Sequence, residues 1–146
     1  MVLVTVSTNP RFYLSENRIR AIFDEVVVYA LNTKQGPLQP GDTDILINDS
    51  KTDPDIDILI QVECRDFPDR IAKQAESLTS IKDLTEKAYY ITRTGGGISV
   101  PDKINVVVWI KYIHAVHVRK SKKSNVEMTE AAVIERIRAR CGFAPN

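Results

Sequence analysis

The strongest constraint on the fold is an order of predicted elements, strand then helix then strand, that occurs twice along the chain. In its first occurrence, the β-branched run at residues 2–6 and the run "TDILI" from Thr43 predict two strands. Between them, apolar residues spaced by three and four predict an amphipathic helix, which Ser15 caps and which ends near Asn32. The glycines and prolines after Asn32 predict a turn-rich loop.

The second occurrence is longer. It begins with a strand from Ile56 and continues through "DFPDR", where Pro68 suits the first turn of a helix because its missing N–H costs nothing there. An apolar stripe over residues 71–91 predicts the second helix. The stretch from Ile104 to Val118 predicts the fourth strand, and it is long enough that we expect a bulge or bend in it.

Two such units in one sheet predict an α+β fold. Right-handed crossovers make the two strands of each unit parallel, so the four-stranded sheet is mixed and both helices lie on one face. A third helix follows, which Thr129 caps and Gly142 ends. We expect a β-α-β-β-α-β domain over residues 1–120 and a C-terminal helical extension of the same domain over residues 121–146.

The composition of the chain limits the partners and the cellular location that we expect. The chain has 146 residues, 43% of them hydrophobic, and its 20 basic and 19 acidic side chains give a net charge of +1. With charges so nearly balanced, we expect no overall electrostatic field that would attract nucleic acid or an anionic membrane. No apolar run approaches the ~20 residues that span a bilayer, and two cysteines do not make a disulfide framework. We therefore expect a cytoplasmic protein without a membrane partner.

Three short patches carry a resemblance to a known family. They are "TNPR" after the first strand, "LNTKQGPLQPGDTDILI" across the first helix end and the second strand, and "VPDKINVVVWIKY" at the entry to the last strand. Spread over residues 1–118, they resemble the corresponding segments of the tautomerase superfamily, which includes the macrophage migration inhibitory factors. The ferredoxin-like fold, which also fits this order of elements, is the alternative.

The resemblance implies a homotrimer whose sheets line a central barrel. It also implies an N-terminal proline that acts as the general base, moving a proton on a small keto or enol carboxylic acid. This chain has Val2 at that position, so the amine would come from Met1 or Val2. The family's lysine corresponds to Lys34, and its later strand tyrosine falls at Asn105. The catalytic candidates are therefore Met1, Val2 and Lys34, and the candidates for binding the substrate are Arg11, Lys34 and Asn105.

An isomerase is one of the functions that the sequence leaves open. Because the proline is missing, the alternative is a non-catalytic module, ferredoxin-like or tautomerase-like, that works through oligomeric assembly or binding. The run "RKSKK" from Arg119 to Lys123 offers a nucleic-acid contact. It has no interleaved aromatic residues for base stacking, so we do not expect nucleic acid to be a partner.

Neither a metal nor a cofactor is expected. His114 and His117 are three apart on a predicted strand, which turns them toward opposite faces of the sheet. Cys64 and Cys141 have no CxxC partner. Cys64 lies beside a predicted helix start, a setting that lowers the pKa of a thiol, although a lone cysteine is more often a small buried hydrophobic residue.

Two arginines bracket the start of the second predicted helix. Arg65 and Arg70 could form an anion site there, since a helix N-terminus favours negative charge. Asp66 and Asp69 are adjacent in the sequence, so local ion pairs explain the arginines equally well.

Overall fold

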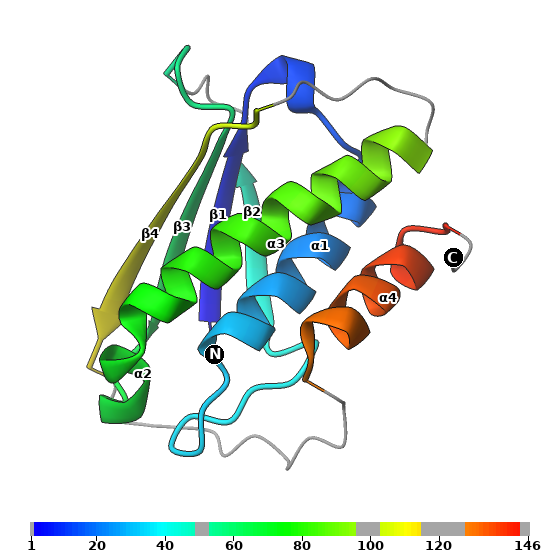
Figure 1. Cartoon of the computed structure of the whole chain (residues 1–146). Coiled ribbons are helices and arrows are strands. Elements are labelled where there is room, and N and C mark those ends of the chain that lie inside the picture. The colour runs from blue at the N-terminus through cyan, green and yellow to red at the C-terminus, as the bar shows by residue number, and fades with distance from the viewer. Residues whose placement is uncertain (1, 49–52, 96–102, 115–127, 144–146) are drawn as a thin grey trace.

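A single sheet and two layers of helices make up the protein in the computed structural model, which describes residues 2–48, 53–95, 103–114 and 128–143. The strands are β1 (Val2–Thr8), β2 (Thr43–Asn48), β3 (Ile58–Arg65) and β4 (Val106–Ile113). The helices are η1 (Pro10–Phe12), α1 (Glu16–Leu31), α2 (Pro68–Ala72), α3 (Gln74–Gly95) and α4 (Glu130–Arg140). Figure 1 shows α1 and α3 side by side across one face of the sheet, with α4 packed against them. The α+β prediction is confirmed.

The sheet is mixed, with the strand order β2-β1-β3-β4. β1 pairs parallel with β2, β3 pairs parallel with β4, and the two central strands, β1 and β3, pair antiparallel. The chain therefore makes two parallel β-α-β units, whose crossover helices are α1 and α3. The outer strands β2 and β4 each leave one edge without a described strand partner.

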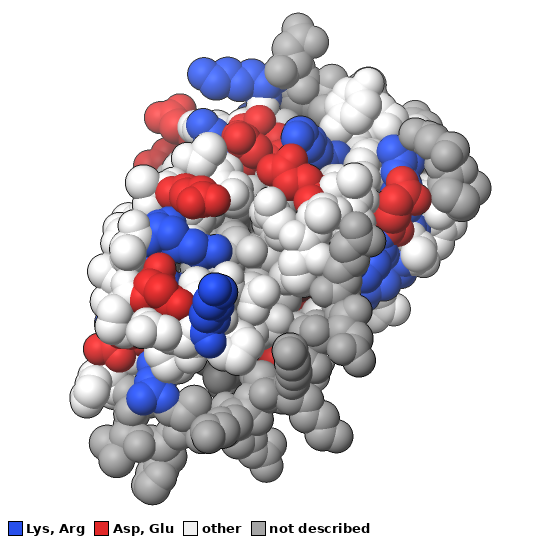
Figure 2. Space-filling view, turned by 60° about the horizontal axis from the view of Figure 1, so that its bottom comes forward, with Lys and Arg blue, Asp and Glu red and all other residues white. Residues whose placement is uncertain are grey.

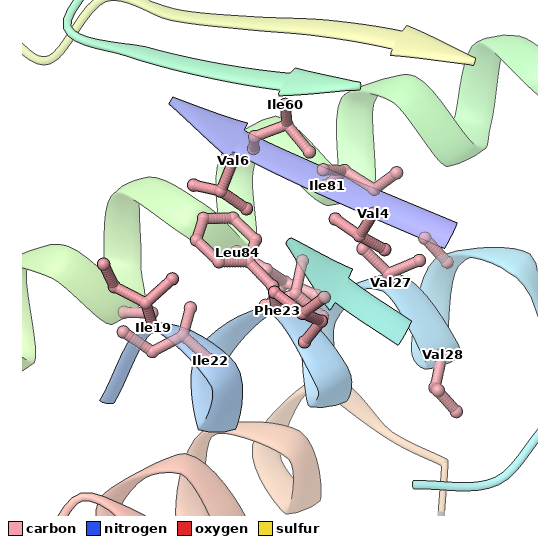
Figure 3. Packing of buried hydrophobic residues seen from close by; sticks show 14 of the residues in the cluster. Val4, Val6, Ile19, Ile22, Phe23, Val27, Val28, Ile60, Ile81 and Leu84 are labelled. Carbon is pink, nitrogen blue, oxygen red and sulfur yellow. The ribbon is translucent and has the colours of Figure 1, made fainter. Parts of the chain in front are cut away.

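The core lies between the sheet and its two crossover helices. Alternate residues of each strand face α1 and α3. The two helices pack apolar residues against them, at the spacing that the sequence predicts. Figure 3 shows these side chains meeting in one layer, with Phe23 and Leu84 near its centre. The labelled residues are Val4, Val6 and Ile60 from the sheet, Ile19, Ile22, Phe23, Val27 and Val28 from α1, and Ile81 and Leu84 from α3.

The observed bounds correct two details. The apolar stripe at residues 71–91 belongs to two helices, because the chain turns at Lys73 (φ −102°, ψ 20°) between α2 and α3. The fourth strand is shorter than expected, since β4 ends at Ile113 and no bulge occurs over its eight residues, which pair with β3 in continuous register. Part of the predicted strand, residues 115–118, lies outside the described residues.

The C-terminal helix is joined to α1 by a cluster of charged side chains. Thr129 caps α4 by accepting a hydrogen bond from the Ala132 N–H at 3.1 Å. Arg136 Nε lies 2.7 Å from Glu25 Oε2, and Arg140 Nη1 lies 3.0 Å from Glu25 Oε1. The same Arg140 nitrogen lies 2.8 Å from Asp24 Oδ2. Because Glu25 is only 1% exposed, α4 forms part of the packed domain.

No helix in residues 2–48, 53–95, 103–114 and 128–143 has the length and apolar content that crossing a bilayer requires. In the same part of the chain, no three His, Cys, Asp or Glu side chains are arranged to hold a metal ion.

Candidate functional site

The structure divides the predicted site residues between the two ends of the sheet. Val2, which is fully buried, begins β1 and donates its N–H to the Asp42 carbonyl at 3.3 Å. Lys34 is exposed in the loop between α1 and β2, at this same end. Arg11 and Asn105 lie beyond the other end of β1, about 20 Å away at the rise of a seven-residue strand. Within one chain, Arg11 and Lys34 therefore cannot hold the same anion. Met1 lies outside the described residues.

Arg11 and Asn105 both contact the buried carboxylate of Asp57. Arg11 Nη2 lies 2.5 Å from Asp57 Oδ1, and the Asn105 backbone N–H donates to Asp57 Oδ2 at 2.7 Å. The Asn105 side chain also donates to the carbonyl of Asp55. These contacts tie the end of β1 to the starts of β3 and β4. Asp57, which was not among the predicted site residues, organises this end of the sheet.

At the opposite end, a buried arginine holds the loop that carries Lys34. Arg70 is 2% exposed, and its guanidinium donates to the carbonyls of Leu31, Gly36 and Arg65 at 3.0, 2.8 and 3.2 Å. It also packs over the ring of Phe67, 5.1 Å from the centroid. Arg70 makes no ion pair with Asp66 or Asp69 among the described residues, and besides the carbonyls its guanidinium interacts with the Cys64 thiol.

Two further contacts fix the same loop. The Gln35 N–H donates to Asp69 Oδ2 at 2.9 Å, and the Asp69 N–H donates to Gln35 Oε1 at 3.0 Å. At Gly36, an added Cβ would lie 2.4 Å from the Phe67 ring, so a residue without a side chain is required there. Lys34 is thus an exposed cation on a firmly held loop, at the end of the sheet where β1 begins.

The polar groups beneath this loop are closed to solvent. Burial raises the pKa of the Cys64 thiol, with Arg70 opposing the shift, so at neutral pH the thiol stays protonated and is a poor nucleophile. Cys64 is 2% exposed and is thus the small buried residue that the sequence favours, without the low pKa that a helix start can give a thiol. The neighbouring Tyr112 hydroxyl is buried without a hydrogen-bond partner among the described residues. Burial also raises the pKa of Tyr112.

The face of the sheet that turns away from α1 and α3 carries three of the six large hydrophobic side chains that are exposed among the described residues. Along β4, residues at positions 106, 108, 110 and 112 face the helices, so Trp109 and Ile113 face the other way, and they are 63% and 41% exposed. Leu46 on β2 is 55% exposed. In the register of the sheet, Leu46, Thr5, Gln61 and Trp109 form one row across all four strands. We call this surface the open face.

A groove runs beside the β2 edge. It has a volume of about 270 Å³. Arg20 spans it, since Nη1 donates to the Ile45 carbonyl at 2.6 Å and the rest of the guanidinium pairs with Glu16. Residues from the start of α1, the segment before it and β2 line the groove: Tyr13, Leu14, Glu16, Ile19, Arg20, Leu46 and Ile47.

The comparisons with known proteins add no family. No family model matches the chain, and no curated protein matches it.

Charge does not favour a nucleic-acid interface on the face of the molecule that Figure 2 shows. Figure 2 shows basic and acidic side chains interspersed on the face in view, without a broad patch of one sign. The run Arg119–Lys123 and the glycines at 96–97 lie outside the described residues. His114 is exposed, with Nδ1 3.4 Å from Asp66 Oδ2.

Proposed function

We propose that the chain is a tautomerase-like protein that works as a homotrimer, with the open face of each sheet turned toward a shared central barrel. One observation carries the proposal: a tryptophan and two large aliphatic residues stand exposed on a sheet face that none of the described helices covers. Leu46 lies on one outer strand, and Trp109 and Ile113 lie on the other, at the edges where another copy would contact the sheet. Assembly removes them from water, which is the main source of association free energy.

The strand pairing supports this proposal over the ferredoxin-like alternative. In a split β-α-β arrangement, another strand lies between the two strands of each unit. Here β1 pairs directly with β2, and β3 with β4. Two free edges and an uncovered face are what a sheet needs in order to close into a barrel with other copies.

Replacing Trp109 with glutamate tests the assembly. We expect Trp109→Glu to weaken self-association by at least about tenfold, because a charge replaces a large apolar side chain at the buried interface. Tyr90→Glu on the outer side of α3 is the matched control, since Tyr90 is 59% exposed and lies away from the sheet face. Sedimentation equilibrium measures both. Equal association for the two variants would contradict the proposal.

The second candidate function is proton transfer on a small keto or enol carboxylate, at the end of the sheet where β1 begins. The observation that favours it is Lys34, an exposed cation on a loop that Arg70 and Asp69 hold at the end of the sheet where β1 begins. In this function Lys34 binds the carboxylate, and the terminal amine, of Met1 or of Val2 after removal of Met1, moves the proton. A primary α-amine has an ordinary pKa of about 7.7–8.0, which suits this role near neutral pH.

Lys34→Ala tests the second candidate. We expect the KM for enol–keto conversion of phenylpyruvate to rise by about 10- to 100-fold, since a charge-assisted hydrogen bond to the carboxylate is lost. Blocking the N-terminal amine should abolish kcat. Lys103→Ala, an exposed lysine at the opposite end of the sheet, is the control and should change neither constant. Wild-type conversion no faster than in buffer would exclude this function.

A further inference from the structure

We infer that neighbouring copies join edge to edge, with β2 of one copy pairing antiparallel with β4 of the next. This inference rests on the proposed homotrimer and specifies its strands and register. The direction follows from the topology. β2 runs parallel to β1, β4 runs parallel to β3, and β1 and β3 are antiparallel. A sheet that continues past β2 into the β4 edge of a second copy therefore meets an antiparallel strand.

One register of the β2–β4 pair brings complementary side chains of the open face opposite each other. Setting Leu46 opposite Trp109 of the next copy also sets Asp44 opposite Lys111, because residue numbers run in opposite senses along antiparallel strands. Leu46 and Trp109 are the two most exposed apolar side chains in the four strands. Asp44 and Lys111 are exposed, carry opposite charges and make no ion pair within the described residues. Directly opposed pairs of both kinds stabilise antiparallel strands.

The neighbouring registers of the same two strands place less favourable side-chain pairs opposite each other. Side chains keep their face only when the register shifts by two residues. One such shift sets Leu46 against Lys111, and the other sets Asp44 against Trp109. Each buries a charge against an apolar group without a partner for the charge. The charge pattern therefore selects a single register.

The groove beside β2 supports the same register from the helix side. In this register Ile47 lies opposite Val108 of the next copy. Both are half-buried apolar side chains at an open edge. The incoming strand covers the groove and supplies backbone donors to β2. Arg20, which now donates to the Ile45 carbonyl, is the donor that it replaces. A charged side chain at a sheet edge is a common way to keep an unpaired edge from indiscriminate pairing.

This contact joins two different edges, so it is a head-to-tail interface. Each copy presents β2 to one neighbour and β4 to the other, and such an interface closes into a ring when the rotation between copies allows. Closure leaves no free edge. The ring is thus consistent with a homotrimer that has one open face per copy turned inward.

A charge exchange tests the register. We expect Asp44→Lys and Lys111→Asp each to weaken self-association by at least about tenfold, since like charges then face each other at every junction. The double variant Asp44→Lys/Lys111→Asp should recover association to within about threefold of wild type. Asp83→Lys/Lys82→Asp, on the exposed side of α3, is the matched control and should behave as wild type. Sedimentation equilibrium and native mass spectrometry measure all of them.

Mixing the two single variants gives a second measurement that also shows that both fold. In a mixed ring of three copies, one junction is mismatched, compared with three in a ring of either variant alone. Mixed complexes should therefore outnumber the pure ones. If wild type is a trimer but the single variants associate as tightly as wild type, the register is wrong and the homotrimer stands. If wild type is a monomer, both proposals fail.

Discussion

Arg70→Met is expected to lower the free energy of unfolding by about 3–5 kcal/mol, the range for a buried charged group that loses its polar contacts. Methionine can fill much of the volume of the arginine stem, so packing changes little. The Leu31 and Arg65 carbonyls then lose the Arg70 donor, and the Gly36 carbonyl keeps only the Thr33 N–H at 3.3 Å, in a site where Arg70 is 2% exposed. Buried carbonyls left without donors make up most of the cost. Urea denaturation followed by circular dichroism measures the change.

Arg65→Met is the matched control for this prediction. Arg65 packs on the same Phe67 ring, 4.7 Å from its centroid, but it is only half-buried and its side chain has no described hydrogen bond. We expect a loss of about 0.5–1 kcal/mol from the cation–π contact. If the two variants lose the same stability, the carbonyl contacts of Arg70 do not hold the Lys34 loop as described here.

Glu25→Gln is expected to cost about 2–3 kcal/mol and to loosen α4. The Glu25 side chain is 2% exposed, and its carboxylate oxygens lie 2.7 Å from Arg136 Nε and 3.0 Å from Arg140 Nη1. Glutamine keeps the shape but removes the charge that neutralises two guanidinium groups. Breaking a fully buried pair costs about 3–5 kcal/mol, and the partial exposure of both arginines, 26% and 39%, reduces it.

Glu16→Gln gives the same substitution at an exposed pair on the same helix. Glu16 pairs with Arg20 one turn away, and both side chains are about half exposed, so the expected loss is about 0.3–0.5 kcal/mol. Urea denaturation compares the two variants, and hydrogen exchange over residues 130–140 reports on α4. If Glu25→Gln is no more costly than Glu16→Gln and α4 stays protected, the ion pairs do not secure the helix.

The secondary structure could be predicted where local signals carry it. Ser15 and the apolar stripe after it predicted the bounds of α1, although the Ser15 side chain makes no capping hydrogen bond, and Thr129 predicted the start of α4. The turn at Lys73 could not be predicted, because the apolar spacing continues across α2 and α3 without interruption. Its cause is tertiary, since Arg70 must reach carbonyls that precede it by 34 and 39 residues.

The contacts of the candidate site could not be predicted from sequence patterns for the same reason. Glu25 and Arg140 are 115 residues apart, so nothing local in the sequence pairs them. Asp57 stood in a short acidic run, and only the meeting of β1, β3 and β4 shows that it joins Arg11 to Asn105. Lys34 could be singled out because the residue type and its place after a helix are local properties.

The mass of the wild-type chain in solution tests the central proposal most directly. Sedimentation equilibrium over a wide range of concentration should give a species of three times 16.4 kDa, the mass of one chain. That result would agree with three sheets closed around their open faces. A mass of one chain at every concentration would contradict the account, because Trp109, Leu46 and Ile113 would then remain exposed to water with no copy to cover them.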